Sequence, residues 1–373
     1  MIRTFIILGG YGGAGQPIAR LLLEHTDVRI IIAGRSLLKA EDFARDLNQN
    51  FPGDRAAAVY VDVDEPQSLG DALKGVDMLI VCSTTSTQAH LIAEYALKAG
   101  IDYLDIYYPQ KVVQALKPLD DEIKRAGRCF ITQAGIHPGM GAPLVRWAAT
   151  QFDQIETANI AMALSFETIG NRNGVKELLG DLVDFSYSYW DKDHWKKGSY
   201  RDTRKFDLGP DWGVKSCIPM GLVELTTLPQ QYKLAECGLW GAGFNWFIDM
   251  FVFPLAALFQ RVDPRFGLNF ITGLFMWGMN RFSKPPFGIV LKLEAQGEIN
   301  NETKHMEVLL EHSDGYLATA IPVAATLLQY IDGSCAQPGL HLMGLLPEPI
   351  RFMKDIKKMG LKVHKLPSRG LGS

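Results

Sequence analysis

Glycines near the N-terminus have a spacing that suits phosphate binding. Within Gly9–Gly15, three glycines fit the pattern G-x-G-x-x-G. This pattern places one glycine in a tight turn, one where the backbone approaches a pyrophosphate, and one where a helix packs closely on a strand. We therefore expect contacts with a dinucleotide at Gly10, Tyr11, Gly12, Gly13 and Gly15.

The residues on either side of these glycines support the same interpretation. Met1–Leu8 is an apolar run typical of a strand, and Gln16–Leu23 has the pattern of an amphipathic helix. Pro17 suits the first turn of a helix, because a missing N–H costs little there. The free N–H groups at the positive end of such a helix bind phosphate. A strand, a turn and a helix in this order predict a dinucleotide site.

The end of the second predicted strand indicates which dinucleotide is bound. Ala33-Gly34-Arg35-Ser36 lacks the carboxylate that holds the ribose 2′-hydroxyl in sites selective for NAD. The Arg35 guanidinium and the Ser36 hydroxyl can both bind a 2′-phosphate, which predicts NADP(H) in preference to NAD(H). The alternatives are a solvated loop arginine and, for Ser36, a helix N-cap.

Polar residues also follow the third and fourth predicted strands. Asp62 either approaches the adenine or serves as an N-cap or turn residue. Ser83 and Thr84 follow the fourth strand in a run of short hydroxyl side chains. They either border the nicotinamide ribose or cap the next helix.

Three residues after the fifth and sixth predicted strands have side chains that can transfer protons. Asp105 ends the fifth strand, Tyr107 follows two residues later, and His137 lies after the sixth strand. Carboxyl, phenol and imidazole groups are common general acids and bases, and histidine titrates near neutral pH. The alternative for Asp105 is a helix cap or a backbone acceptor, and for His137 it is a structural role.

Alternating strand and helix patterns must position these residues. Short, nearly unbroken apolar runs are typical of strands buried on both faces, and their alternation with helices predicts a doubly wound parallel sheet. Ligands of such sheets bind beyond the carboxyl ends of the strands. The predicted strands are Met1–Leu8, Val28–Ala33, Ala56–Val61, Val76–Val81, Tyr103–Ile106 and Arg128–Thr132, with helices from Gln16, at Leu37–Asn50 and at Thr87–Ala99.

The pattern changes after residue 141. Thr157–Leu164 is predicted to be a strand and Lys176–Trp190 a helix. Ile289–Ile299 alternates apolar and polar residues and turns at two asparagines into Thr303–His312, which predicts an antiparallel hairpin. Leu317–Ile331 is predicted to be a helix.

Composition narrows the class of protein. Of 373 residues 47% are apolar and 21% charged, which is typical of soluble globular proteins. The net charge of −3 favours neither nucleic acid nor an anionic membrane as a partner. The five cysteines are widely spaced and none has zinc spacing, so we expect free thiols, no metal site and a reducing compartment. Without a cleavage site after the first apolar run, we predict a cytoplasmic protein.

An aromatic block at Leu239–Phe282 departs from this ordinary composition. Its length would admit a membrane helix, but Asn245, Asp249 and Pro254 argue against one, so we predict no transmembrane span. The block is instead a dimer face, the wall of an apolar substrate cleft or a patch in peripheral contact with lipid.

Four segments together resemble the saccharopine dehydrogenase and saccharopine reductase family. They are Gly9–Leu23, Ala33–Leu47, Ala93–Asp105 with its Tyr-x-Asp ending, and Gln133–Met140, which is similar to that family's G-x-x-P-G turn. The resemblance implies an N-terminal Rossmann domain at 1–139 and an α+β substrate and dimerisation domain with a mostly antiparallel sheet at 140–314. It further implies C-terminal helices at 315–373 that return to the Rossmann domain, and a homodimer.

The resemblance also implies a reaction. NAD(P)H would reduce an imine of a small-molecule substrate in the cleft between the two domains. Relatives in the broader family include enoyl reductases and lipid-associated oxidoreductases, so an enoyl reductase with an apolar or lipid-like substrate is an alternative. A sensor or scaffold that binds NADPH without turnover is the alternative from another class.

Overall fold

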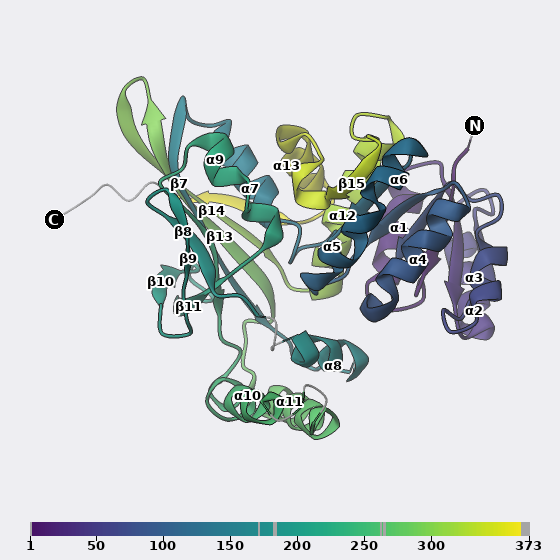
Figure 1. Ribbon diagram of the computed structural model, residues 1–373, viewed down its shortest axis with the longest axis horizontal. Coiled ribbons are helices and arrows are strands. Elements are labelled where there is room, and N and C mark those ends of the chain that lie inside the picture. The colour runs from purple at the N-terminus through teal and green to yellow at the C-terminus, as the bar shows by residue number, and fades with distance from the viewer. Residues whose placement is uncertain (1, 171, 182–184, 262, 264–265, 367–373) are drawn as a thin grey trace. The chain divides into compact units, whose positions relative to one another are not determined.

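The chain folds into two compact units. The computed structural model describes residues 2–170, 172–181, 185–261, 263 and 266–366 (Figure 1). One unit contains residues 1–140 and 319–359, and the other contains residues 141–318 and 360–373. Each unit has its own β-sheet. The units are therefore described one at a time.

The first unit is built on seven parallel strands in the order β15-β6-β5-β4-β1-β2-β3. The doubly wound parallel sheet predicted from the sequence is confirmed, and its six predicted strands all form. The seventh strand, β15, comes from the C-terminal segment and pairs with β6. The strands are β1 (Thr4–Leu8), β2 (Arg29–Gly34), β3 (Ala56–Tyr60), β4 (Met78–Val81), β5 (Asp102–Asp105), β6 (Cys129–Thr132) and β15 (Gly339–Leu342).

Helices cover this sheet on both faces. Ile18 and Leu22 of α1 are buried, and Tyr330 of α12 packs on Phe5 of β1 with ring centroids 6.2 Å apart. The helices of this unit are α1 (Gly15–His25), α2 (Leu37–Asn50), α3 (Pro66–Ala72), α4 (Ala89–Lys98), α5 (Lys111–Leu116), α6 (Asp120–Arg125), α12 (Gly315–Ile331, whose first turn lies in the second unit) and α13 (Pro349–Lys358).

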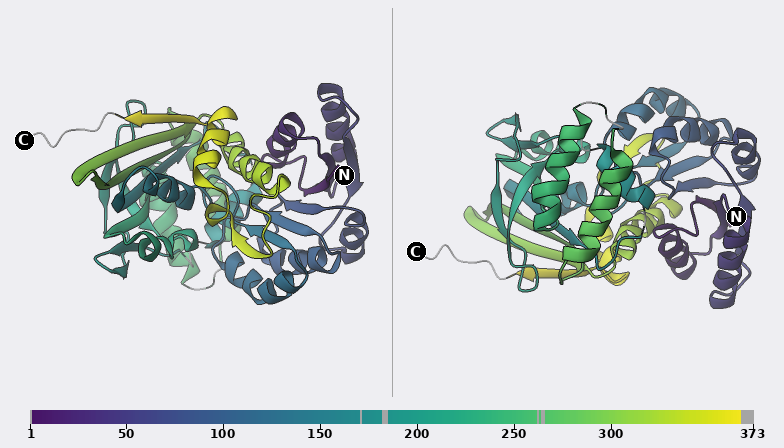
Figure 2. Two further views of the ribbon diagram at one scale, coloured as in Figure 1. Left: turned by 90° about the horizontal axis from the view of Figure 1, so that it is seen from above. Right: turned by 90° about the horizontal axis from the view of Figure 1, so that it is seen from below.

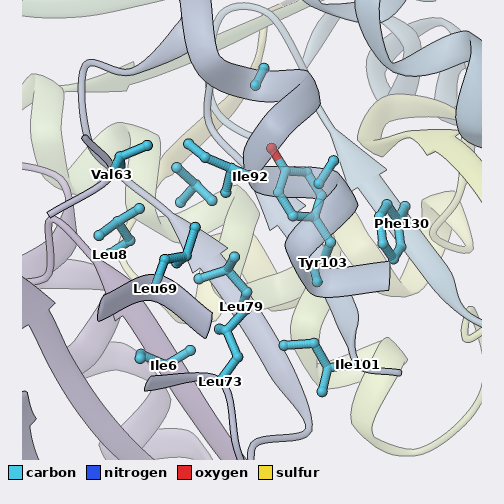
Figure 3. Packing of buried hydrophobic residues seen from close by; sticks show 14 of the residues in the cluster. Ile6, Leu8, Val63, Leu69, Leu73, Leu79, Ile92, Ile101, Tyr103 and Phe130 are labelled. Carbon is cyan, nitrogen blue, oxygen red and sulfur yellow. The ribbon is translucent and has the colours of Figure 1, made fainter. Parts of the chain in front are cut away.

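A large apolar cluster joins the strands to helices α3–α6 (Figure 3). Leu79 of β4 and Tyr103 of β5 lie in it beside Ile92 of α4, and the Tyr103 ring stacks on Phe130 at 5.2 Å. Each fully buried side chain of this size contributes roughly 1.5–3 kcal/mol. The cluster therefore holds the strand ends, and the loops that follow them, in fixed positions.

The second unit is built on nine strands, mostly antiparallel, as predicted. Its main path runs β10-β11-β12-β7-β13-β14-β16, with β8 paired to β12 and β9 to β8; only β12–β7 is a parallel pair among those described. The strands are β7 (Gln154–Ser165), β8 (Ser188–Asp191), β9 (His194–Lys197), β10 (Arg204–Asp207), β11 (Val214–Met220), β12 (Glu236–Ala242), β13 (Gly288–Ile299), β14 (Glu302–His312) and β16 (Lys362–Leu366).

The predicted antiparallel hairpin is confirmed in this sheet. Strands β13 and β14 pair from Ile289 opposite His312 to Ile299 opposite Glu302. The turn residues Asn300 and Asn301 both have positive φ, of 54° and 62°. Asparagine tolerates that conformation well, and two such residues match the twist of the flanking strands.

One prediction of secondary structure is wrong. The helix expected over Lys176–Trp190 ends with α8 at Gly180; residues 182–184 lie outside the described residues, and Trp190 belongs to β8, where it pairs with Cys237 of β12. The helix predicted at Leu317–Ile331 is confirmed as α12. The segment after it contributes the helix α13 and also strands β15 and β16, each of which forms the edge of a sheet.

The aromatic block does not form one continuous helix. It begins in β12 and continues as a π-helical turn, η5 (Ile248–Val252), then α10 (Phe253–Gln260) and α11 (Leu268–Phe282). No helix among the described residues is long and apolar enough to cross a membrane. The remaining helices of this unit are α7 (Gly141–Ala149), α8 (Arg172–Gly180) and α9 (Leu228–Tyr232).

A buried lysine links two strands of the second sheet. Lys292 of β13 is 2% exposed, and its Nζ lies 3.0 Å from Glu294 and 2.7 Å from Glu307 of β14. Removing one partner of a buried ion pair leaves the other charge uncompensated in a poorly hydrated place. Lys292 therefore stabilises the sheet only as long as both carboxylates are present.

We predict that Lys292→Met lowers the free energy of unfolding of the second unit by about 2–3 kcal/mol. All seven tryptophans lie within residues 141–318, so tryptophan fluorescence during urea denaturation reports this unit. The matched control is Lys304→Met, which removes an exposed pair with Glu302 on β14 and should cost less than about 1 kcal/mol. Equal losses in the two variants would contradict the role of Lys292.

Candidate functional site

The glycine turn after β1 is held by contacts that leave no room for side chains. The Gly9 N–H donates to the carbonyl of Ala33 at 2.8 Å, and the Gly12 N–H donates to Gly9 at 2.9 Å. A Cβ on Gly15 would lie 2.5 Å from the Gly9 oxygen, and one on Gly10 would lie 2.8 Å from the Ile7 oxygen. Glycine at both positions is what allows α1 to start directly against the end of β1.

The start of α1 has no competing cap. Its N-cap residue, Ala14, makes no side-chain hydrogen bond, and the first turn contains no acidic residue. The first N–H groups of a helix have no partner within the helix, and they carry its positive end. The residues present therefore fit a pyrophosphate at this point.

Tyr11 places its ring across the end of β2. A Cβ on Gly34 would lie 2.7 Å from Tyr11 Cε1, and the Ser36 N–H donates to Tyr11 Oη at 3.0 Å. Ser36 Oγ accepts the N–H of Lys39 at 3.4 Å, so Ser36 is the N-cap of α2. Arg35 is exposed and makes no hydrogen bond or ion pair within the described part of the chain. Its guanidinium is therefore available to an anion beside Tyr11.

Asp62 and Thr84 are two further residues that the sequence predicted to contact the cofactor. Asp62 Oδ1 accepts the N–H of Asp64 at 3.1 Å, which makes it a turn residue. Thr84 is exposed after β4. Contacts of Asp62 with adenine, and of Thr84 with ribose, stay predictions.

Three hydroxyl groups form a chain at the ends of β4 and β5. Ser83 Oγ lies 2.8 Å from Thr85 Oγ1, which lies 2.8 Å from Tyr107 Oη. The chain abuts the glycine turn, because a Cβ on Gly9 would lie 2.9 Å from the Ser83 nitrogen. Thr85 was not singled out from the sequence. The only signal for it was the run of hydroxyl residues after β4, which did not say which member would face Tyr107.

Asp105 joins the ends of β5 and β6. Its Oδ1 accepts the N–H of Tyr107 at 3.1 Å and the N–H of Gln133 at 3.0 Å. The carboxyl group is fully buried, and this burial raises the pKa of Asp105 to about 6, against the opposing effect of the Gln133 N–H. Asp105 is thus a backbone acceptor, and its titration near neutral pH also suits proton transfer.

Several polar groups are buried around Asp105. The Thr132 and Tyr103 hydroxyls interact with the Asp105 carboxyl group and lower its pKa against the larger effect of burial, and Gln133 Oε1 has no hydrogen-bond partner among the described residues. Gln133 also has a positive φ of 55°, and its Nε2 donates to the Pro109 carbonyl at 3.3 Å. Unsatisfied polar atoms and strained backbone concentrate at functional sites. The sequence contains no signal for Gln133, because glutamine rarely adopts this conformation.

His137 lies in the turn after β6 with a neutral ring. Part of the side chain is exposed, but both ring nitrogens are buried and have no partner among the described residues. This burial lowers the pKa of His137 to about 4. The ring packs on Tyr108 with centroids 5.7 Å apart. At pH 7 His137 is therefore an uncharged imidazole.

The first unit brings most of the predicted site residues to one edge of its sheet. The glycine turn, Ser83, Asp105, Tyr107 and His137 all follow the carboxyl ends of strands, and Arg35 and Ser36 follow β2. Contacts connect the glycine turn to Ser83, and the hydroxyl chain connects Ser83 to Tyr107. No group of three histidine, cysteine or acidic side chains within the described ranges is arranged to hold a metal ion.

Comparisons with known proteins support a dinucleotide site. Residues 5–131 match the family model described as the saccharopine dehydrogenase NADP binding domain. The chain is 24% identical over 407 aligned residues to carboxynorspermidine synthase of Vibrio cholerae, covering 94% of each protein. A stretch of 135 residues, 36% of this chain, is 24% identical to saccharopine dehydrogenase (NADP+, L-glutamate-forming) of Saccharomyces cerevisiae and covers 28% of that enzyme.

A solved structure has the same fold over the whole chain. Apo saccharopine dehydrogenase (L-Glu forming) from Saccharomyces cerevisiae superimposes with a TM-score of 0.70 at 16% identity, covering 98% of this chain and 100% of that one. The predicted fold class is thereby confirmed for both units.

The buried carboxyl group of Asp105 predicts a pH dependence of stability. Because its pKa is raised from 3.8 to about 6, the folded state keeps the proton to higher pH than the unfolded chain does. Stability of the first unit therefore falls as the pH rises through this window. Asp105→Asn keeps an oxygen acceptor and abolishes the titration. We expect the variant to match the parent at pH 4 and to exceed it by about 2–3 kcal/mol at pH 8.

Hydrogen exchange at the amides of β1 and β4 measures this difference within the first unit. The control is Asp71→Asn, because the hydrogen bond from Lys74 lowers the pKa of Asp71 and should give a small change of opposite sign. A variant at Asp105 that is less stable than the parent at pH 8 would show that the buried carboxylate is net stabilising.

Proposed function

We propose that this chain, whose residues 5–131 belong to the saccharopine dehydrogenase NADP-binding domain family, is an NADP(H)-dependent oxidoreductase that reduces imines. The observation that carries the proposal is the hydroxyl chain from Ser83 through Thr85 to Tyr107. The chain begins at Ser83, beside the glycine turn. The similarity to carboxynorspermidine synthase along 94% of both chains supports a small-molecule amine product.

Imine reduction needs one hydride and one proton. When bound, the reduced nicotinamide supplies the hydride to the imine carbon. The nitrogen gains a proton, so that a C=N bond becomes a CH–NH bond. Tyr107 holds a proton on a hydroxyl that is already hydrogen-bonded to Thr85, and a phenol in this position can donate it. Asp105 orients Tyr107 through its backbone N–H, and the neutral His137 ring serves as an acceptor.

The cofactor in this proposal is NADP(H) rather than NAD(H). Arg35 follows the end of β2 and is exposed, and its guanidinium has no hydrogen-bond or ion-pair partner among the residues that the structure describes. A guanidinium binds a phosphate through charged, directional hydrogen bonds that a ribose hydroxyl cannot match. Ser36 and Tyr11, which are hydrogen-bonded to each other, border the same place.

We predict that Arg35→Ala raises the dissociation constant of NADPH by about tenfold to hundredfold, because a charged hydrogen bond is worth about 1.5–3 kcal/mol. The dissociation constant of NADH should change less than about twofold. Titration of nucleotide fluorescence measures both without requiring turnover. Lys39→Ala, which removes an exposed cation four residues further on, in α2, is the matched control and should leave both constants unchanged. Equal weakening of NADPH and NADH by Arg35→Ala would overturn the 2′-phosphate assignment.

An enoyl reductase is a second candidate. The observation that favours it is the set of exposed large apolar side chains on η5, α10 and α11, which suits an apolar substrate better than an amino acid. Carbon–carbon double-bond reduction needs the same hydride and a proton on carbon.

The deciding assay is NADPH oxidation with pairs of amines and carbonyl compounds and, separately, with unsaturated acyl thioesters. We expect turnover with an amine–carbonyl pair, and we expect Tyr107→Phe to lower kcat by about 10²–10⁴-fold without loss of NADPH binding. Tyr60→Phe, a change at an exposed tyrosine at the end of β3, is the control. Turnover with thioesters alone would favour the enoyl reductase. Tight NADPH binding with no turnover on either panel would favour a sensor.

A further inference from the structure

The helical part of the aromatic block exposes an unusual number of large apolar side chains. Seven of them are between 53% and 68% exposed. We refer to them together as the α10–α11 apolar face. Its members are Trp246, Met250, Phe251, Leu258, Phe266, Phe270 and Trp277. Figure 2 shows the two helices side by side in the view from below.

The α10–α11 apolar face is not the surface that these helices use to pack on the rest of the second unit. The opposite sides of the same segments already pack into a core of their own, which includes Ile248, Val252, Ala256 and Phe275. The exposed residues recur at helical spacing, since Trp246, Met250 and Leu258 are separated by multiples of four positions. Helices that are apolar on all sides are typical of segments that contact another apolar phase.

Charged residues near the face are predominantly basic. Arg261, Arg281 and Lys284 are exposed around it, and the Arg281 guanidinium lies 5.7 Å from the Phe282 ring centroid. The acidic residues described between positions 244 and 284 are Asp249 and Asp263, both exposed, and Asp249 accepts the N–H of Phe244 at 3.0 Å. Three exposed bases therefore stand against two exposed acids. The local charge is therefore opposite in sign to the net charge of −3 of the whole chain.

We propose that the α10–α11 apolar face docks onto the surface of an anionic lipid bilayer. Tryptophan and phenylalanine side chains insert at the boundary between headgroups and acyl chains, and flanking arginine and lysine side chains bind lipid phosphates. The segment lies on the membrane and does not cross it, in keeping with the lengths of the described helices.

A second copy of the chain suits this face less well. A two-fold dimer joins the same patch of both copies. It would bring Arg261, Arg281 and Lys284 of each copy to one interface with only Asp249 and Asp263 to oppose them, so that like charges outnumber opposite ones. A bilayer containing anionic lipid offers the complementary charge to all three. The proposal rests on the surface of the second unit and is independent of the reaction that the first unit supports.

The test is flotation of the full-length protein with vesicles of phosphatidylcholine alone or mixed with phosphatidylglycerol. We expect binding to the mixed vesicles that weakens with added salt, and a blue shift of tryptophan emission because Trp246 and Trp277 enter the interface. Met250→Gln and Leu258→Gln should each weaken binding by about tenfold. Arg281→Gln should weaken binding to the anionic vesicles and leave the weak binding to neutral ones unchanged.

Matched controls come from exposed apolar residues elsewhere in the same unit. Tyr200→Gln and Val214→Gln should not alter vesicle binding. Near-ultraviolet circular dichroism checks that each variant is folded. Two results would overturn the proposal. One is that the folded parent protein neither binds the mixed vesicles nor shows a shift of its tryptophan emission. The other is dissociation by Met250→Gln of a dimer that sedimentation detects in the absence of lipid, which would assign the face to a second copy.

Discussion

The buried carboxylate of Asp105 is the interaction on which the candidate site depends. One oxygen accepts the N–H groups of Tyr107 and Gln133, and so ties the loop after β5 to the turn after β6. Neither loop belongs to the sheet, and each carries a candidate for proton transfer. Without this acceptor two buried N–H groups would lose their partner, and the Tyr107 hydroxyl would lose its fixed position beside Thr85. The strained backbone of Gln133, with a φ of 55°, is maintained by the same bond.

Burying the Asp105 carboxyl group also carries an electrostatic cost, because burial disfavours its charged form. Burial raises the pKa of Asp105 to about 6, although the Thr132 and Tyr103 hydroxyls and two backbone N–H groups oppose this rise. A fully apolar or fully satisfied strand end would be more stable. Such a cost is typical of residues kept for function, and it lies at the strand ends where doubly wound sheets bind their ligands.

The second unit distributes polar and apolar groups in an unexpected way. Its sheet buries Lys292 between two glutamates, while the α10–α11 apolar face carries tryptophan and phenylalanine in contact with solvent. Buried ion pairs specify strand register more than they stabilise, because a shifted pairing would leave a charge unpaired. Exposed aromatic side chains stabilise nothing in the isolated chain. The buried lysine suits a sheet with one defined strand register, and the exposed aromatic side chains suit contact with another surface.

The parallel sheet and the glycine turn follow from patterns within a few adjacent residues, so they could be predicted from the sequence. Patterns of the same kind predict 2′-phosphate contacts at Arg35 and Ser36, and they carry the resemblance of the N-terminal segment to the saccharopine dehydrogenase NADP binding domain, whose family model matches residues 5–131. Most of strands β1–β6 could be recognised because both faces are buried, which makes their apolar runs nearly continuous; the edge strand β3 is only partly buried. Only the tertiary structure decided that Thr85 meets Tyr107, that Asp105 holds Gln133, and that β15 and β16 complete the two sheets. It also decided that Trp190 belongs to a strand and that the aromatic block presents a face to solvent. These outcomes depend on partners far away in the chain, and neither local propensity nor residue spacing encodes which distant segment will supply them.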